Sequence, residues 1–366
     1  MLTHSIPVFD LKARTETDRK RRSTSIFSYL NNSARPGCEA SRMLIEDWFL
    51  HIPTGEQKEL RSRFRSGVDV HFGSAFHELS LHELLLRQSC KARPHPTAAT
   101  SKKRPDFSVV EPDGSEFLLE AKVSTAIASG PDRDPRLSGL QDFLNELQIP
   151  GFLLGVDELS CGATNLSPKS LRRHIQESLQ NVVTDQSSFV RLPTFKTNDG
   201  WKIRLTAISE ATPEVNKTTV RYQAWSHMWT GPSYSLHDAL KEKARRYGTE
   251  LGMPFVIAVN SFDALLCTSD FEAALFGEHA LWGTADNPQY SRVSAVLYTT
   301  NLWPQTLLMG QVESRLYLNP FADWPYQGTL TKLDTFKFEG GSWSHESGTP
   351  MYHLLKLNLL NSSLWN

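Results

Sequence analysis

The order of the predicted elements indicates a mixed α/β fold, because helices come first, a β-hairpin follows, and helices and strands then alternate. Three early helices are expected, at residues 39–51, 55–65 and 74–88. Apolar residues recur at helical spacing in the first, and Thr54 with Gln57 resembles a capping box that opens the second. The hairpin has strands at 105–110 and 116–124, joined by the turn sequence Pro-Asp-Gly-Ser. This order predicts a sheet flanked by helices.

The alternating part of the chain contributes the remaining predicted elements. We expect helices at 137–147, 167–183, 236–247 and 271–276, and strands at 152–156, 201–209, 254–260, 293–299 and 314–318. In domain terms, we expect an N-terminal arm and helices over residues 1–70, a core over 71–310 and a C-terminal extension over 311–366. A large inserted segment, at about 126–230, is expected to interrupt the core.

The composition is that of an ordinary globular protein without membrane segments. Its 366 residues are 39% hydrophobic and 22% charged, and the longest apolar stretches are only strand-sized. The first twelve residues lack the apolar core of a signal peptide. The four cysteines lie far apart with no CxxC pair, which argues against a zinc ribbon or a disulfide framework. We therefore expect a cytoplasmic protein with no membrane partner.

The formal net charge of −1 does not by itself indicate a nucleic-acid binder. Binding of a nucleic acid would therefore need a local basic surface. Candidate segments lie at residues 19–22, 61–65, 102–104 and 241–246. The alternative is that each is an ordinary solvated face.

The returning strand of the hairpin places two opposite charges on one face. Residues two apart in a strand point the same way, so Glu120 and Lys122 project together with Leu118. A buried charge is costly unless it is paired or bound to a metal, so this placement calls for an explanation. The alternative is an exposed cross-strand charge pair.

A third charged residue, Asp106, begins the preceding strand fourteen positions before Glu120. Antiparallel pairing can bring the two carboxylates together. With the backbone carbonyl of Ala121 they make an all-oxygen site suited to Mg²⁺, for which Mn²⁺ can substitute. Lys122 can then orient or deprotonate a water molecule near a phosphate. These are the groups needed to hydrolyse a phosphodiester.

The residues RPDF…LEAK resemble the PD-(D/E)xK nuclease superfamily, which includes restriction endonucleases, Holliday-junction resolvases and many repair and defence nucleases. The resemblance implies a restriction-endonuclease-like α/β core, with Asp106 and Glu120 as metal ligands and Lys122 as the catalytic lysine. It also implies a further acid on the helix before the hairpin, where Glu78 fits and Glu83 is the rival. The wider pattern FHELSLHELL…HP…RPDF…LEAK…KARRYG…PFVIAVN is similar to a group of bacterial proteins.

The superfamily also uses a later helix that offers a basic side chain to the phosphate. The helix at 236–247 looks like this element, with Lys243 or Lys241 as the basic group. This chain departs from the usual pattern because more than a hundred residues separate Lys122 from that helix. The alternative is that the helix at 137–147 is the core helix. Lysines on a charged helix are also often simply solvated.

The sequence His-Glu at 77–78 and 82–83 invites comparison with zinc proteases. The two histidines are five residues apart, whereas the HExxH motif needs four so that both imidazoles share one helix face. The spacing therefore excludes a zinc-protease motif of the HExxH type. Glu78 and His82 could instead form an ordinary pair on the helix surface.

The sequence therefore predicts a Mg²⁺-dependent endonuclease that acts on DNA. The alternative is a catalytically inactive nuclease fold that serves as a nucleic-acid-binding or structural subunit. The aromatic-rich segment 302–366 suggests a homodimer, since cleavage of two strands often needs two sites. Any partner proteins would be encoded elsewhere.

Overall fold

The computed structural model describes residues 6–96, 104–124, 135–147, 149, 152–180, 189–209, 220–222, 232–245, 251–262, 268–276, 280–339 and 341–365. The chain divides into two compact units. The main unit comprises Met1–Lys20, Ser25–Ala126 and Thr230–Asn366, and the second unit comprises Arg21–Thr24 and Ile127–Trp229. The expected inserted segment, at about 126–230, has nearly the same limits as the larger piece of the second unit.

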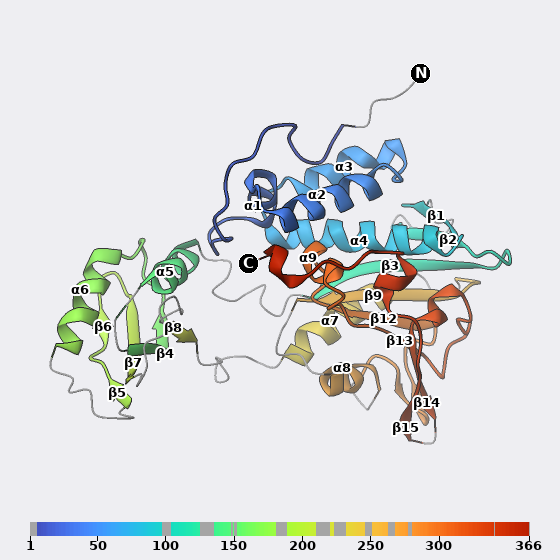
Figure 1. Ribbon diagram of the computed structural model, residues 1–366. Coiled ribbons are helices and arrows are strands. Elements are labelled where there is room, and N and C mark those ends of the chain that lie inside the picture. The colour runs from blue at the N-terminus through green and yellow to red at the C-terminus, as the bar shows by residue number, and fades with distance from the viewer. Residues whose placement is uncertain are drawn as a thin grey trace. The chain divides into compact units, whose positions relative to one another are not determined.

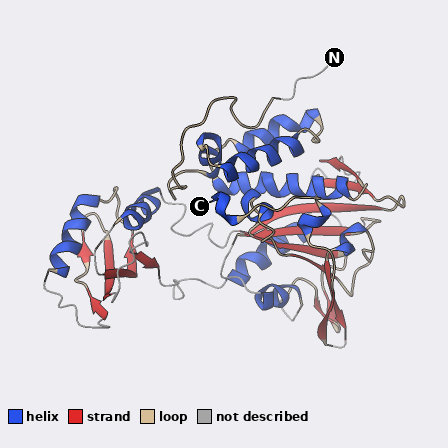
Figure 2. Cartoon of the chain, in the orientation of Figure 1, coloured by secondary structure: helices blue, strands red, loops and turns tan. Residues whose placement is uncertain are grey.

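A large mixed sheet forms the centre of the main unit (Figures 1 and 2). In sheet order its strands are β1 (Lys91–Pro94), β2 (Phe107–Val110), β3 (Glu116–Ser124), β9 (Phe255–Ser261), β12 (Ala295–Thr300), β13 (Ser314–Leu318), β14 (Asp334–Glu339) and β15 (Ser342–Glu346). Strands β3, β9 and β12 run parallel at the centre, while β1 and β2 pair antiparallel at one edge. A small hairpin, β10 (Gly283–Thr284) and β11 (Asn287–Pro288), lies outside this sheet.

Helices cover both faces of the sheet (Figure 1). One face carries α1 (Ile26–Asn32), α2 (Pro36–Phe49), α3 (Thr54–Phe64), α4 (Asp69–Arg87), α9 (Pro304–Leu308) and α10 (Met351–Leu354), and the other carries α7 (Pro232–Ala244) and α8 (Thr268–Leu275). Short 3-10 turns, η3 (Thr329–Lys332) and η4 (Ser362–Trp365), occur near the C-terminus. Among the described residues no helix is both long and apolar enough to cross a membrane.

The central strands are buried on both faces, so their side chains divide between two hydrophobic cores. In β9 all seven residues are buried. Val256 and Ala258 pack towards α4, whereas Phe255, Ile257 and Val259 pack towards α7 and α8. For this reason, the sequences of parallel strands with helices on both faces are continuous runs of apolar residues.

The second unit is a smaller α/β body. Its strands are β4 (Phe152–Ser160), β5 (Phe189–Arg191), β6 (Phe195–Lys196), β7 (Lys202–Ser209) and β8 (Val220–Tyr222), in the order β5-β7-β4-β8 with β6 also pairing β7. Helices α5 (Pro135–Glu146) and α6 (Pro168–Leu179) pack on one face, where Leu144, Leu171 and Trp201 join a core of the unit's own. The helix expected at 137–147 thus belongs to this unit and not to the main sheet.

The segment expected as a C-terminal extension, 311–366, is part of the main sheet, because it contributes β13, β14 and β15. Aromatic residues of the segment, among them Tyr317, Phe336 and Trp343, pack against one another and into the core shared with α7 and α8. Their density is explained by burial within one chain. A homodimer stays a prediction without this motivation.

Close packing between α4 and the end of β9 gives a test of the fold. A Cβ atom on Gly73 would lie 2.5 Å and 2.6 Å from ring atoms of Phe262, whose ring stacks on Trp303 with centroids 3.9 Å apart. We expect Gly73→Ala to lower the free energy of unfolding by about 1–3 kcal/mol in urea denaturation, because the stacked rings must shift. Gly55→Ala in α3 is the control, since no atom of the described residues lies within 4 Å of its added Cβ. Equal effects of the two substitutions would contradict this packing.

Candidate active site

Asp106 and Glu120 meet where the two strands of the hairpin separate. The ladder of β2 and β3 ends at the pair Phe107 and Leu119, so Asp106 lies one residue beyond it and opposite Glu120. The Asp106 amide donates to Glu120 Oε2 (3.3 Å), and the Ala121 amide donates to Asp106 Oδ2 (2.7 Å). The expected strand at 105–110 therefore begins later, at Phe107, because side chains replace the main-chain hydrogen bonds.

The alternation of β3 directs Glu120 and Lys122 towards α7. Leu119 and Ala121 belong to the core beneath α4, whereas Leu118 packs with the core of α7 and α8. Glu120 is 0% exposed, so the alternative of an exposed charge pair is wrong for this residue. Lys122 is half-buried, and its Nζ donates to Glu242 Oε2 (2.7 Å) on α7.

Lys243 is the cation that faces the two carboxylates. Leu236, Leu240 and Ala244 anchor the buried face of α7, and Lys243 shares this face because it lies three residues after Leu240. Its Nζ donates to Glu120 Oε1 (2.5 Å) and lies 3.8 Å from Asp106 Oδ2. Helical phase thus selects Lys243 over Lys241. Helix α7 packs on the face of β3 that carries Glu120, and α4 packs on the opposite face.

The cluster of Asp106, Glu120 and Lys243 holds two carboxylates against one ammonium in a place shielded from solvent. Burial, together with the neighbouring charge of Glu120, raises the pKa of Asp106 to about 6, although Lys243 acts in the opposite direction. Two carboxylates this close do not ionise easily together. Protonation of one carboxylate, or binding of an added cation, would therefore stabilise the cluster.

A fully buried histidine lies near this cluster. His77 on α4 is 0% exposed, and neither of its ring nitrogens has a hydrogen-bond partner among the described residues. Burial, and then the charge of Lys243, lowers the pKa of His77 to about 3, so the ring is neutral near pH 7. His77 therefore adds no second positive charge beside Lys243 near pH 7.

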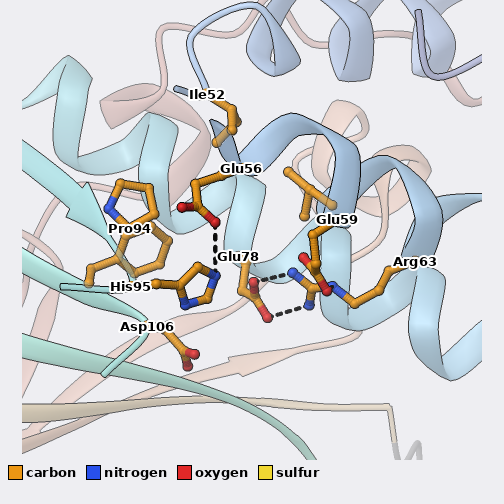
Figure 3. A pocket seen from close by; sticks show the side chains of 10 residues that line it. Ile52, Glu56, Glu59, Arg63, Glu78, Pro94, His95 and Asp106 are labelled. Atoms are coloured by element: carbon orange, nitrogen blue, oxygen red, sulfur yellow. Dashed lines mark hydrogen bonds and ion pairs between the residues drawn. The ribbon is translucent and has the colours of Figure 1, made fainter. Parts of the chain in front are cut away.

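Glu78 lies in the same pocket as Asp106 but is held by an arginine. Nη1 and Nη2 of Arg63 on α3 donate to its two carboxylate oxygens, each at 2.5 Å (Figure 3). Arg63 also contacts Glu59, at 2.9 Å from Nε to Oε1. The pocket is lined further by Glu56 and His95, which form an ion pair of 3.8 Å if the histidine is protonated.

The rival carboxylate, Glu83, has structural partners elsewhere. Its oxygens are bound by Arg87 Nε (2.6 Å) and His51 Nδ1 (2.7 Å), and it is 1% exposed. His82, the residue that could have paired with Glu78, packs its ring near Phe107 with centroids 6.0 Å apart. Glu78 is therefore the acid of α4 that shares a pocket with Asp106.

The donors present suit a hard cation only in part. Within the described part of the chain, no three His, Cys, Asp or Glu side chains lie close enough to hold a metal ion. The backbone nevertheless supplies a third oxygen. The Leu118 amide bonds Pro254 on the β9 side, so the amide and carbonyl of Ala121, three residues later, point to the opposite edge, towards Asp106. Asp106, Glu120 and the Ala121 carbonyl thus share one edge of β3.

The basic segment at 61–65 is used within the fold. Besides the pairing of Arg63 with Glu78, Arg61 Nε donates to the Pro7 carbonyl (2.7 Å) and Arg65 Nη1 to the Val8 carbonyl (2.8 Å). These contacts tie α3 to the N-terminal segment, and the sequence alone did not predict them. Of the other candidate basic segments, residues 102, 103 and 246 lie outside the described residues.

Comparison of the chain with protein-family models, with curated proteins and with solved structures gives no significant match.

The pKa of Asp106 predicts a pH-dependent stability. An acid whose pKa rises on folding, here from 3.8 to about 6, binds more protons when folded than unfolded in that window. The stability contributed by this residue therefore falls as pH rises from about 4 to about 6. Asp106→Asn mimics the protonated acid. Above pH 6 we therefore expect the free energy of unfolding of this variant to exceed that of the wild type, by about 3 kcal/mol at most. Urea denaturation in chelator from pH 4 to 8 measures this difference in the free energy of unfolding between variant and wild type. The difference should disappear near pH 4.

Asp113 is the matched control in the same hairpin. Hydrogen bonds from the Ser115 side chain and amide lower its pKa, so the stability it contributes is present above pH 4 and is lost in acid. Asp113→Asn should therefore bring no gain near neutral pH. A loss of stability in Asp106→Asn that is the same at pH 4 and pH 8 would contradict the electrostatic account.

Proposed function

We propose that this protein is a metal-dependent endonuclease that hydrolyses phosphodiester bonds, in DNA, with a PD-(D/E)xK-type site on a restriction-endonuclease-like core. The observation that carries the proposal is that Asp106 and Glu120 meet where the hairpin strands separate, and that Lys243 of α7 contacts both carboxylates. Hydrogen bonds and an ion pair link three residues that lie up to 137 positions apart in the chain. The hairpin, the parallel strand β9 and helix α7 support the proposal.

The chemistry of the cluster's donors supports a divalent cation as the cofactor. Asp106 and Glu120 offer carboxylate oxygens and Ala121 offers a carbonyl, and these are the ligands that Mg²⁺ and Mn²⁺ accept. Burial, and then the charge of Glu120, raises the pKa of Asp106, and an added cation would favour the ionised form of this carboxylate. Glu78 would join the ligands after release from Arg63.

Each protein group has a role in this proposal. When bound, Mg²⁺ neutralises charge on the phosphate and lowers the pKa of a bound water. Lys122 orients or deprotonates the attacking water, and its exposed pairing with Glu242 is weak enough to be exchanged. Lys243, released from Glu120, holds the phosphate oxygens.

Cleavage of plasmid and single-stranded DNA with Mg²⁺ or Mn²⁺ tests the proposal. We expect Asp106→Ala and Lys122→Ala to reduce the rate by about a hundredfold or more, because each removes a ligand or a proton-transfer group. Asp113→Ala and Lys241→Ala are the matched controls, since Asp113 belongs to the other Pro-Asp pair of the hairpin and Lys241 neighbours Lys243 on α7. A well-folded Lys122→Ala variant that cleaves at the wild-type rate would refute the assignment.

One observation favours a second function, that of a silent nuclease fold acting as a binding or structural subunit. Lys243 already supplies a positive charge to Glu120, and Arg63 already occupies Glu78. The protein's own cations thus stand beside the acids that a metal would need. Titration with Mn²⁺ followed by calorimetry distinguishes the two functions. Saturable binding that is lost in Asp106→Asn supports the nuclease, and no uptake by wild type supports the silent fold.

A further inference from the structure

A cavity of about 470 Å³ lies in the main unit between α1, α2 and the start of α9. It is separate from the candidate active site, because none of its lining residues belongs to the hairpin, α4 or α7. Its volume falls within the range of roughly 300–1,000 Å³ that is typical of sites for small organic ligands.

The walls of the cavity are apolar and aromatic. Ile26 and Leu30 on α1 face Trp303 and Pro304 at the start of α9, and Tyr29 also lines the space. The Trp303 indole is fixed by its stack on Phe262, with the ring planes 16° apart. These walls suit a flat, largely apolar group such as an aromatic ring.

A buried hydroxyl at the wall lacks a partner. Ser41, in the middle of α2, is 0% exposed, and its Oγ has no hydrogen-bond partner in the part of the chain that the structure describes. A helical serine usually returns its hydroxyl to the carbonyl four residues earlier. Leaving a buried hydroxyl unpaired is costly, so a polar atom supplied by a ligand would satisfy it.

Two cations line the same cavity. Arg19 and Lys20 are exposed, and Lys20 Nζ lies 3.8 Å from Asp69 Oδ2, a loose ion pair. Among the residues that the structure describes, no acidic side chain lines the cavity. The lining therefore combines an aromatic interior, one buried polar atom and a positive rim.

We infer that this cavity binds a nucleoside phosphate, either free or as the end of a nucleic-acid strand. The base would lie against Tyr29 and Trp303 and bond the Ser41 hydroxyl, while Arg19 and Lys20 would pair with the phosphate. The base and the phosphate account for the aromatic walls and the positive rim together, which neither a neutral aromatic nor inorganic phosphate would do. This inference does not depend on nuclease activity.

Calorimetric titration of the full-length protein in chelator, where the candidate metal site cannot contribute, tests the inference. The probes are AMP, adenosine and ribose 5-phosphate. AMP should bind at least about tenfold more tightly than either fragment, because each fragment lacks one of the two recognised groups. A 5′-phosphorylated oligonucleotide and its unphosphorylated counterpart identify the source, since tighter binding of the former than of AMP assigns the site to strand ends.

Two variants and one control locate the binding. Arg19→Glu should weaken AMP at least about tenfold, and Ser41→Ala about threefold or more, with unchanged melting temperatures. Arg173→Glu is the matched control, because Arg173 is an exposed arginine of the second unit. The inference is overturned if AMP fails to bind at millimolar concentration, if adenosine binds as tightly as AMP, or if Arg19→Glu behaves like Arg173→Glu.

Discussion

The buried ion pair between Glu120 and Lys243 is the interaction on which the arrangement of the main unit depends. Glu120 lies on a central strand with no exposure to solvent, where an unpaired carboxylate would cost several kcal/mol. Lys243 offsets that cost from a helix 123 residues further along the chain. The pair is compatible with only one rotation of α7 on the sheet, the rotation that also buries Leu236, Leu240 and Ala244.

The pair satisfies Glu120 but leaves the site with an excess of negative charge. Asp106 is brought within 3.8 Å of the same ammonium and is shielded from solvent, so its ionised form is disfavoured. A fold selected only for stability would place an amide at position 106, which could accept the same hydrogen bond from Ala121. A carboxylate at this position is what the proposed cation-binding site would need.

Arginine and lysine stand beside the acids that the proposed metal would need. Lys243 contacts Glu120 and Arg63 contacts Glu78, so uptake of a divalent ion would require exchange of internal cations for an external one. Both side chains are long enough to turn towards a substrate phosphate after release. If these contacts persist and no metal binds, the protein is the catalytically silent fold. The affinity for metal therefore decides between the two functions.

Local patterns in the sequence determined the hairpin, the acids that it carries and most helices of both units. Turn residues and a two-residue period specify β3 and the shared face of Glu120 and Lys122, because these depend only on neighbours in the chain. The sequence left open whether Lys243 or Lys241 is the basic group of α7, and the structure places Lys243 beside the acids. Only the tertiary structure decided that α7, and not α5, packs on β3, that Glu78 is held by Arg63, and that residues 311–366 complete the sheet. Periodicity specifies which face of an element is buried, whereas the partner of that face is chosen by packing and charge between segments far apart in the chain.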